Sequence, residues 1–415
     1  MEQRAYKFRI YPKTDEKERL ERTLYLCKKL YNTELEQRIL AYRVQRKSVK
    51  VREQENELPR LKEEMPEYRE IYSQVLQNAT KRLDKSFDNF FRRNKLRKQG
   101  YKIKVGFPRF KSSKQYKSIT YPQNANSAFV IMADGNLMLA KIGKIRMFKH
   151  REIEGKIKTC TIKKHSDNEW YAIFTVEREE KTKKVPKTAI GIDIGLKQLI
   201  KATDGTTIEP PKYLRKSEEQ IKHWSREVSY KIKGSGKRKK CIKKLARAYR
   251  RVERKRDDYL HKVSRDLVNR ADIIVFEDLR IQNMLKNHKL AKSIGDASWG
   301  KLIRYTSYKA DSAGGSVYYV NPNGTSQICS RCGNWVQKDL SERIHSCPSC
   351  GYKSDRDLNA SFNILNRYLK KRVGADSLEL YNKTPVEMLP LPSPSQDLAC
   401  NVEEAGSPKG MMSPL

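Results

Sequence analysis

Apolar and polar positions alternate at the start of the chain and then change to a helical spacing. Tyr6, Phe8 and Ile10 recur at every second position before Pro12, which predicts a first strand. Apolar residues then recur every three or four positions in two runs, which predicts two long helices joined by a polar stretch around 45–68. The expected core positions are Leu20, Leu24, Cys27, Tyr31 and Leu35 in the first helix, and Leu76, Ala79, Leu83, Phe87 and Phe90 in the second.

Short β-branched segments separated by Gly and Pro follow between residues 100 and 178. They lie at 118–121, 129–132, 137–140, 157–162 and 170–176. Short strands with frequent turn residues are typical of a small antiparallel barrel or sandwich. We expect the first strand to complete it.

Two nearly continuous apolar runs lie in the second half of the chain, as buried strands require. The run 188–201 contains a single acid, Asp193, and the run 271–276 is followed by Glu277 and Asp278. Asp204-Gly205 predicts a hairpin turn after the first run.

The charge balance points to a polyanionic partner. Lys and Arg total 88 against 49 Asp and Glu, a formal net charge of +39. A phosphate backbone gains affinity for such a protein by releasing counterions. No run approaches the roughly 18 apolar residues that a membrane-spanning helix needs, and no signal-peptide pattern is present. Nucleic-acid binding is therefore the expected class of function.

The densest basic segment is 231–256, with 14 basic residues in 26 and Glu253 as its only acid. A thin apolar stripe predicts an amphipathic helix. Such a run can simply be a solvated face, but this density favours contact with phosphates. The residues expected to make it are Lys237, Arg238, Lys239, Lys240, Lys243, Lys244, Arg247, Arg250 and Arg251.

Four of the eight cysteines form two CxxC pairs, Cys329 with Cys332 and Cys347 with Cys350. Two pairs of thiolates at this spacing complete a tetrahedral zinc site, and a glycine after each pair suits the tight turns of a zinc ribbon. Four sulfur ligands leave no open position for water, so the expected zinc ion is structural. Scattered single thiols suggest a reducing compartment, and we expect an intracellular, cytoplasmic protein.

Three separated acids are candidates for a catalytic magnesium site: Asp193, Glu277 and Asp357. Buried carboxylates that converge from different elements are tolerated when they hold hard cations, and two Mg²⁺ ions can support phosphodiester hydrolysis. Taken singly, each acid could instead end a strand or cap a helix. For the pair in DRDLN, we expect Asp357 to be the metal ligand and Asp355 to be either the cap or a residue that supports the metal ligands.

The order of these motifs resembles the TnpB family of transposon-encoded proteins, relatives of the type V CRISPR effector nucleases. The similarity rests on GIDIG, FEDL, TSQICSRCG with CPSCG, and DRDLNASFNIL, with YKFRIYP and PRFKSSK in the first half. It implies an RNA-guided DNA endonuclease in which a guide RNA from the transposon end pairs with double-stranded target DNA beside a short transposon-adjacent motif. By resemblance, Asp193, Glu277 and Asp357 are the magnesium-binding acids of a RuvC-like nuclease and the four paired cysteines bind zinc.

The resemblance also implies a mixed α and β, multidomain fold. Residues 1–12 and 106–182 are expected to form a wedge-like β-barrel, and 13–105 a helical recognition insertion. An RNase H-like RuvC domain over 183–370 would contain the basic helix and an inserted zinc ribbon, 325–353. Residues 371–415, acidic and proline-rich, are expected to be disordered.

Residues that read the target-adjacent motif are expected on the second long helix and in the segment SITYPQN. The candidates are Ser73, Gln77, Asn78, Tyr121 and Gln123. Gln and Asn can bond an adenine edge, and Tyr can stack or contact phosphate. An ordinary polar surface explains the same residues nearly as well.

Other classes of protein compete with this interpretation. A strand-joining DNA transposase could use the same acids, but it usually needs a helix-turn-helix module, and no clear one is present. An actin-like or sugar-kinase ATPase would leave Asp357, the cysteines and the charge unexplained. A nucleic-acid-binding regulator without cleavage stays possible despite the three acids. No interface pattern demands a dimer, so we expect a monomer on RNA and no membrane partner.

Overall fold

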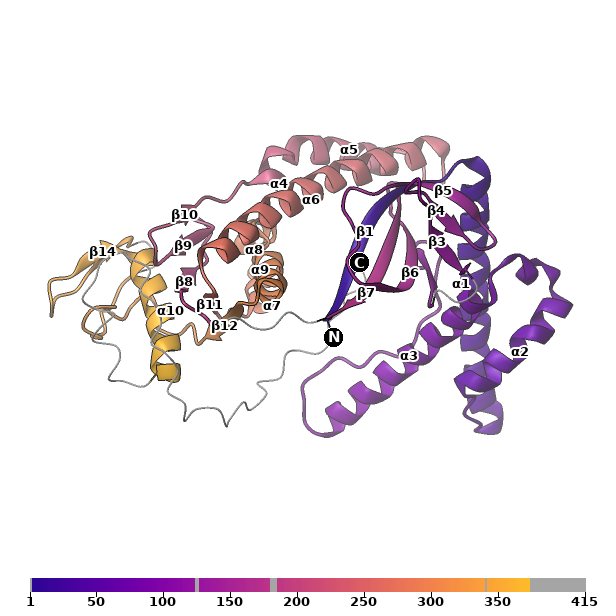
Figure 1. Ribbon diagram of the computed structural model, residues 1–415, viewed down its shortest axis with the longest axis horizontal. Coiled ribbons are helices and arrows are strands. Elements are labelled where there is room, and N and C mark those ends of the chain that lie inside the picture. Colours follow the sequence, from indigo (N-terminus) through magenta and orange to yellow (C-terminus); the bar gives the residue numbers. More distant parts are fainter. Residues whose placement is uncertain (1, 124–126, 180–184, 340–341, 374–415) are drawn as a thin grey trace. The chain divides into compact units, whose positions relative to one another are not determined.

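The computed structural model describes residues 2–123, 127–179, 185–339 and 342–373. These residues fall into two compact units, one of 2–179 with 224–247 and one of 185–223 with 248–373. Each unit contains its own sheet (Figure 1). The two units are therefore described separately.

The first unit is built on a nearly closed, barrel-like sheet in which every neighbouring pair of strands is antiparallel. Its order is β2-β6-β7-β1-β5-β4-β3. The strands are β1 Glu2–Tyr11, β2 Ser118–Tyr121, β3 Phe129–Ile131, β4 Leu137–Leu139, β5 Gly143–Phe148, β6 Lys156–Lys164 and β7 Trp170–Arg178. The first strand thus lies inside the sheet, between β7 and β5, as predicted. Strand β5 was missed, although Ile145 and Met147 alternate with Lys144 and Arg146.

The helices of the first unit differ from the prediction in one respect. The segment between the two long helices, α1 Thr14–Gln45 and α3 Ser73–Lys98, is not a simple polar connection but contains helix α2 Val51–Glu64 and the 3₁₀ helix η1 Pro66–Glu70. Gln54 of α2 is buried, and its amide donates to the Glu34 carbonyl oxygen and accepts from Arg38. Leu58 of α2 is also buried, but a buried polar residue interrupts the apolar pattern of this helix, so the helix was overlooked.

The second unit contains a mixed five-stranded sheet in the order β10-β9-β8-β11-β12. Strands β8 Ala189–Asp193, β11 Ile273–Glu277 and β12 Ser316–Val320 are parallel, whereas β9 Ile200–Ala202 and β10 Thr207–Ile208 are antiparallel to their neighbours. Ile274 and Phe276 point into one core, and Ile273 and Val275 into another. Apolar cover on both faces explains the unbroken apolar run of β11.

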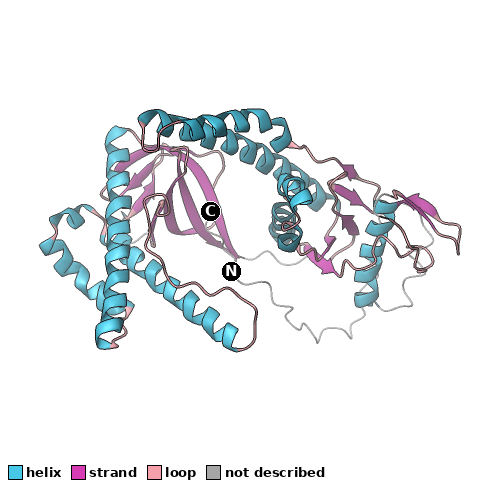
Figure 2. Ribbon diagram, turned by 180° about the vertical axis from the view of Figure 1, so that it is seen from behind, coloured by secondary structure: helices cyan, strands magenta, loops and turns pink. Residues whose placement is uncertain are grey.

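The chain from residue 213 onward also contains helices, shown from behind in Figure 2, and residues 224–247 of them belong to the first unit. These helices are α4 Tyr213–Lys216, α5 Glu218–Tyr230, α6 Gly236–Arg270, α7 Ile281–Met284, α8 His288–Ala297, α9 Trp299–Ala313 and α10 Arg356–Val373. The predicted basic helix corresponds to α6, which begins at Gly236 rather than Lys231 and continues to Arg270. No helix of the described residues is long and apolar enough to span a membrane.

A small hairpin of strands β13 Ile344–Ser346 and β14 Lys353–Asp355 precedes α10 directly. It carries the second cysteine pair of the predicted ribbon. The expected tail, 371–415, lies outside the described residues from 374 onward.

Candidate functional site

Two of the three candidate acids end neighbouring parallel strands. Asp193 is the last residue of β8 and Glu277 the last of β11, and the two strands are hydrogen-bonded in parallel up to Ile192 opposite Phe276. The carboxyl ends of parallel strands meet at one edge of a sheet, which is where ligands bind in open α/β folds. The strand register therefore places both acids at the same edge.

Helix α10 carries the third acid to this edge because it packs unusually closely on β8. A Cβ atom at Gly191 would lie 2.3 Å from the carbonyl oxygen of Ser361 and 2.8 Å from the backbone nitrogen of Leu365. Only a residue without a side chain permits this approach. Asp357, in the first turn of α10, then lies near Asp193.

Asp355 caps α10, which is one of the two roles predicted from the sequence. One of its carboxylate oxygens accepts hydrogen bonds from the backbone N–H groups of Asp357, at 2.9 Å, and Leu358, at 3.0 Å. A side-chain acceptor of this kind satisfies donors that a helix start otherwise leaves unbonded. The cap leaves the carboxylate of Asp357 available for another role.

Burial raises the pKa of two of the three acids, Asp193 and Glu277. Burial raises the pKa of Asp193 well above its usual range, and the negative charges of Glu277 and Asp357 raise it further. Burial also raises the pKa of Glu277, while a hydrogen bond from the Thr325 hydroxyl opposes this shift. Buried carboxylates that repel one another are costly unless a positive ion lies among them. Mg²⁺ is the cation that such oxygen ligands favour beside a phosphate.

Two arginines lie close to the third acid. Arg356 Nε is 3.5 Å and Arg343 is 3.8 Å from the carboxylate oxygens of Asp357. Within the described ranges, the four cysteines are the only group of three or more candidate ligands whose ligand atoms all lie within 4.8 Å of one another. The three carboxylates are thus more widely spread than the ligands of one closed site.

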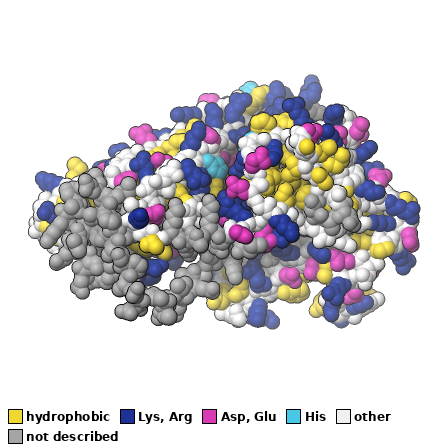
Figure 3. All heavy atoms as spheres, viewed as in Figure 1, with side chains coloured by type: hydrophobic (Ala, Val, Ile, Leu, Met, Phe, Trp, Pro, Cys, Tyr) yellow, Lys and Arg dark blue, Asp and Glu magenta, His cyan; other side chains and the backbone are white. Residues whose placement is uncertain are grey.

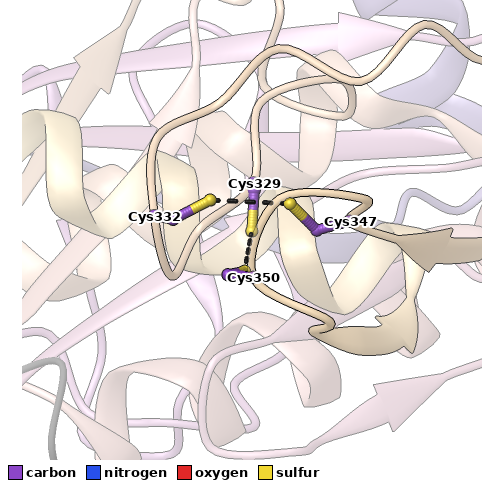
Figure 4. Close-up of side chains that lie close together, drawn as sticks. All are labelled: Cys329, Cys332, Cys347 and Cys350. Carbon is purple, nitrogen blue, oxygen red and sulfur yellow. Dashed lines mark hydrogen bonds between the residues drawn. The ribbon is translucent and has the colours of Figure 1, made fainter.

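The four paired cysteines converge on one point (Figure 4). The sulfur atoms of Cys329 and Cys350 are 3.7 Å apart, and those of Cys332 and Cys347 are 3.5 Å apart. Zinc bonds of ~2.3 Å in a tetrahedron require sulfur separations of about 3.8 Å, so the four thiols fit a zinc ion. The cluster confirms the predicted convergence of these residues.

The turns around the cysteines have the geometry that the spacing predicts. Gly333 and Gly351 have φ angles of 81° and 71°, and their N–H groups donate to the carbonyl oxygens of Cys329 and Cys347. Burial acts to raise the pKa of Cys347, but hydrogen bonds from the backbone N–H groups of Cys350 and Ser349, together with those from the Cys332 and Cys350 side chains, lower it to about 6. Burial instead raises the pKa of Cys329 to about 12, so without a metal ion the thiols of the cluster differ in acidity.

Three asparagines that sequence reasoning missed, Asn359, Asn363 and Asn366, connect α10 to the start of the cysteine segment. The buried Asn359 donates to the carbonyl oxygen of Ile328 and accepts from the N–H of Ser330, at 2.8 and 2.9 Å. Asn363 donates to the carbonyl oxygens of Thr325 and Ile328, at 2.8 and 2.6 Å. The spacing of four between Asn359 and Asn363 in DRDLNASFNIL, which places both amides on one face of a helix, was the available signal.

Thr325 links the hydrogen bonds of the α10 asparagines to the acids. Its backbone carbonyl is held by Asn363, and its hydroxyl donates to Glu277. The cysteine segment therefore contacts the acidic edge through one side chain.

The candidate motif-reading residues lie in two places with different accessibility. Ser73 and Gln123 are exposed, and Gln77 and Asn78 are half-buried. Tyr121 is 1% exposed and its hydroxyl donates to the Ala140 carbonyl oxygen. It is a core residue, and the expectation that its ring stacks on a nucleotide does not fit this position.

Most of the basic residues expected to contact phosphate are solvent-accessible on α6. Three of the nine are engaged within the chain: Arg238 donates to the carbonyl oxygens of Val228 and Lys231, Arg250 pairs with Glu253 at 2.6 Å, and Lys244 lies over the Trp224 ring, 4.4 Å from its centroid. Lys and Arg side chains are distributed over most of the face seen in Figure 3 rather than gathered in one patch.

Three family profiles match the chain. One described as "Probable transposase" covers residues 173–288, one described as "Cas12f1-like, TNB domain" covers 299–364, and one described as "Helix-turn-helix domain" covers 1–47. A protein of Streptomyces pristinaespiralis provisionally named an RNA-guided DNA endonuclease is 33% identical over 369 residues, 87% of this chain and 88% of that protein. The chain belongs to the TnpB family.

Further relatives agree with this membership. A protein of Escherichia coli K12, provisionally named RNA-guided DNA endonuclease InsQ, is 31% identical over 310 residues, 71% of this chain and 74% of its own. Among solved structures, CasPhi-2 (Cas12j) bound to crRNA matches 88% of this chain and 98% of its own at 10% identity, with a TM-score of 0.44, too remote to argue from. In this TnpB-family protein, residues 2–45 form strand β1 and the single long helix α1, not two helices joined by a turn.

Proposed function

We propose that the chain is an RNA-guided DNA endonuclease of an insertion-sequence transposon. The observation that carries the proposal is the meeting of Asp193, Glu277 and Asp357 at one sheet edge, in a family whose relatives bear that name. A guide RNA from the transposon end would pair with target DNA beside a short transposon-adjacent motif. The RuvC-like site would then hydrolyse phosphodiester bonds.

The three acids would hold Mg²⁺ at this edge of the sheet, two of them from strands and one from a helix. Bound Mg²⁺ would lower the pKa of a water and stabilise the leaving oxygen. Asp193 and Glu277 are held rigidly by the parallel strands that they end. Thr325 orients the carboxylate of Glu277 by donating to it, and Asp355 fixes the helix turn that carries Asp357.

The remaining parts have supporting roles in this proposal. The four cysteines would bind one structural zinc ion, because their sulfur positions fit a closed tetrahedral site. Residues 1–12 and 106–182 would form the wedge-like barrel, 13–105 the recognition insertion and 183–370 the nuclease domain. The charge of +39 suits a protein that binds a guide RNA and target DNA. In this proposal the protein acts as a monomer in the prokaryotic cytoplasm.

A strand-joining transposase is the second candidate, because one matching profile is described as a transposase and another as a helix-turn-helix domain. The continuous helix α1, Thr14–Gln45, offers no such module. The endonuclease therefore remains the proposal, and a regulator that binds without cutting is the other outcome of its test.

The test begins with protein expressed together with its native flanking DNA. RNA that remains bound after a high-salt wash is sequenced, and the complex is given matching plasmid DNA with and without Mg²⁺. We expect one discrete RNA and Mg²⁺-dependent cleavage that Asp193→Ala abolishes while RNA binding persists. Asp278→Ala is the matched control, because this acid is exposed beside Glu277. Heterogeneous RNA or none, or cleavage that survives Asp193→Ala, would overturn the proposal.

A further inference from the structure

An open groove of about 1140 Å³ lies within the first unit, away from the acids and cysteines described above. It is formed by the second half of α1, the start of α2, the second half of α3 and residues 107–110. All of these elements belong to one compact unit. The candidate site residues of the preceding sections do not line it.

The floor of the groove is aromatic. The ring of Phe107 meets those of Phe87 and Phe90 edge-on, with centroids 5.5 and 5.3 Å apart. Phe91 packs against the same group yet is 61% exposed, and Phe110 is also exposed. Several solvent-exposed phenylalanines that line one groove are typical of a binding surface.

The rim of the groove is cationic. Arg43, Lys47, Lys50, Arg52 and Arg109 line it, beside Arg38 and the acids Asp84 and Asp88. Arg38 is neutralised by Asp84 at 2.9 Å, and Lys47 lies 3.5 Å from Glu53. In the described part of the chain, Arg43, Arg52 and Arg109 have no acidic partner within 4.0 Å. Aromatic rings flanked by unpaired cations are the combination that binds bases by stacking and phosphates by charge.

We propose that this groove binds an unpaired segment of RNA, with bases against the phenylalanines and phosphates against the arginines. The bases of duplex DNA are already stacked on one another, whereas the loops and ends of an RNA present free base faces. Three cations without an acidic partner at the rim favour a polyanion over a protein partner, because phosphates gain affinity from such cations by releasing counterions. This inference goes beyond the proposed nuclease activity. It rests on the proposed function only in taking the bound RNA to be the guide RNA.

The first test is binding of a fluorescent octauridine RNA to the full chain by anisotropy, at several salt concentrations. Phe91→Ala and Phe107→Ala are each expected to weaken binding at least about fivefold without changing its salt dependence. Arg109→Gln is expected to reduce the slope of log affinity against log salt by about 0.7. Phe148→Ala is the matched control, because Phe148 is 62% exposed on β5 and outside the groove.

The second test places the RNA in the native complex. RNA containing 4-thiouridine is copurified with the chain and crosslinked by ultraviolet light, and the attached peptides are expected to come from residues 87–110. Crosslinks elsewhere only, or crosslinks of thymidine analogues in target DNA instead, would overturn the assignment. The assignment would also be overturned if Phe91→Ala and Phe107→Ala left octauridine binding unchanged but abolished a dimer seen by sedimentation. That result would identify a second copy of the chain as the occupant of the groove. Neither test measures cleavage, so their failure is distinguishable from failure of the nuclease proposal.

Discussion

Replacing Gly191 by alanine should disturb the acidic edge without touching any acid. Gly191 lies in the middle of β8, two residues before Asp193, and the backbone of α10 passes directly over it. Adding one methyl group pushes α10 away from β8. Asp357 moves with the helix, whereas Asp193 stays with the strand.

The size of the effect follows from the distances. The added carbon would be 2.3 Å from the Ser361 carbonyl oxygen, and contacts in proteins become ordinary only beyond about 3.4 Å. The helix must therefore withdraw by roughly 1 Å, and backbone atoms cannot swing aside as a flexible side chain would. Overpacking of this kind costs about 1–3 kcal/mol of stability. A misplacement of roughly 1 Å between groups that act together can cost about 100-fold in rate.

The assay compares thermal unfolding and the single-turnover rate of guided cleavage for Gly191→Ala and a control. Gly295→Ala is the control, because Gly295 lies in helix α8 and its added carbon would meet nothing within 4 Å apart from its chain neighbours and the backbone of its own helix. We expect Gly191→Ala to lower the melting temperature by several degrees and the rate far more than its stability loss explains. Gly295→Ala should be neutral or stabilising by up to about 1 kcal/mol. Normal rate and stability for Gly191→Ala would refute the close packing of α10 on β8.

Three further predictions concern the acids and the cysteines. Thr325→Val removes the hydroxyl donor to Glu277, so the raised pKa of Glu277 should rise further and the pH–rate profile of cleavage should shift to higher pH. Thr325→Ser keeps a hydroxyl and should restore the original profile. An unshifted profile for Thr325→Val would contradict this role. In metal-free protein the pKa of Asp193 is higher folded than unfolded, so its contribution to stability is complete below the unfolded pKa and is lost as pH rises through the folded pKa. Asp193→Asn should therefore raise the melting temperature near pH 8 by an amount equivalent to about 1 kcal/mol while abolishing cleavage, and a fall in melting temperature would count against the repulsion. Cys347→Ser should lose bound zinc, measured by atomic emission, and expose the hairpin to limited proteolysis, whereas Cys241→Ser should keep its zinc; retained zinc in the first variant would argue against the four-sulfur site.

The pattern of apolar residues predicted strands and helices correctly where the buried residues recur at the period of the element. The alternation in residues 6–10 predicted β1, and the unbroken apolar run 271–276 predicted the doubly covered strand β11. Helix α2 was missed although Val51, Leu58 and Leu61 recur at helical spacing, because Gln54, on the same face, is polar and mostly charged residues fill the positions between them. The buried Gln54 finds its partners on α1. Periodicity records which residues are apolar, not which polar residues find partners.

The candidate site shows the same limit. The cysteine spacing was enough to predict the cluster, because both turns are local. The capping role of Asp355 was predictable for the same reason. The bonds from Asn363 to Thr325 and from Thr325 to Glu277 span 38 and 48 positions in the chain, and the groove around Phe107 depends on where a loop packs. Contacts of this kind follow from tertiary packing, which no local pattern encodes.

The most direct test of the central claim is to change the guide. The guide segment of the copurified RNA is replaced by an unrelated sequence, and the complex is offered two plasmids, one matching the old guide and one the new, each beside the same flanking motif. If the protein is an RNA-guided endonuclease, cleavage moves to the plasmid that matches the new guide and stops on the other. Cleavage that stays with the old sequence would mean that the protein reads DNA itself, and would contradict the account.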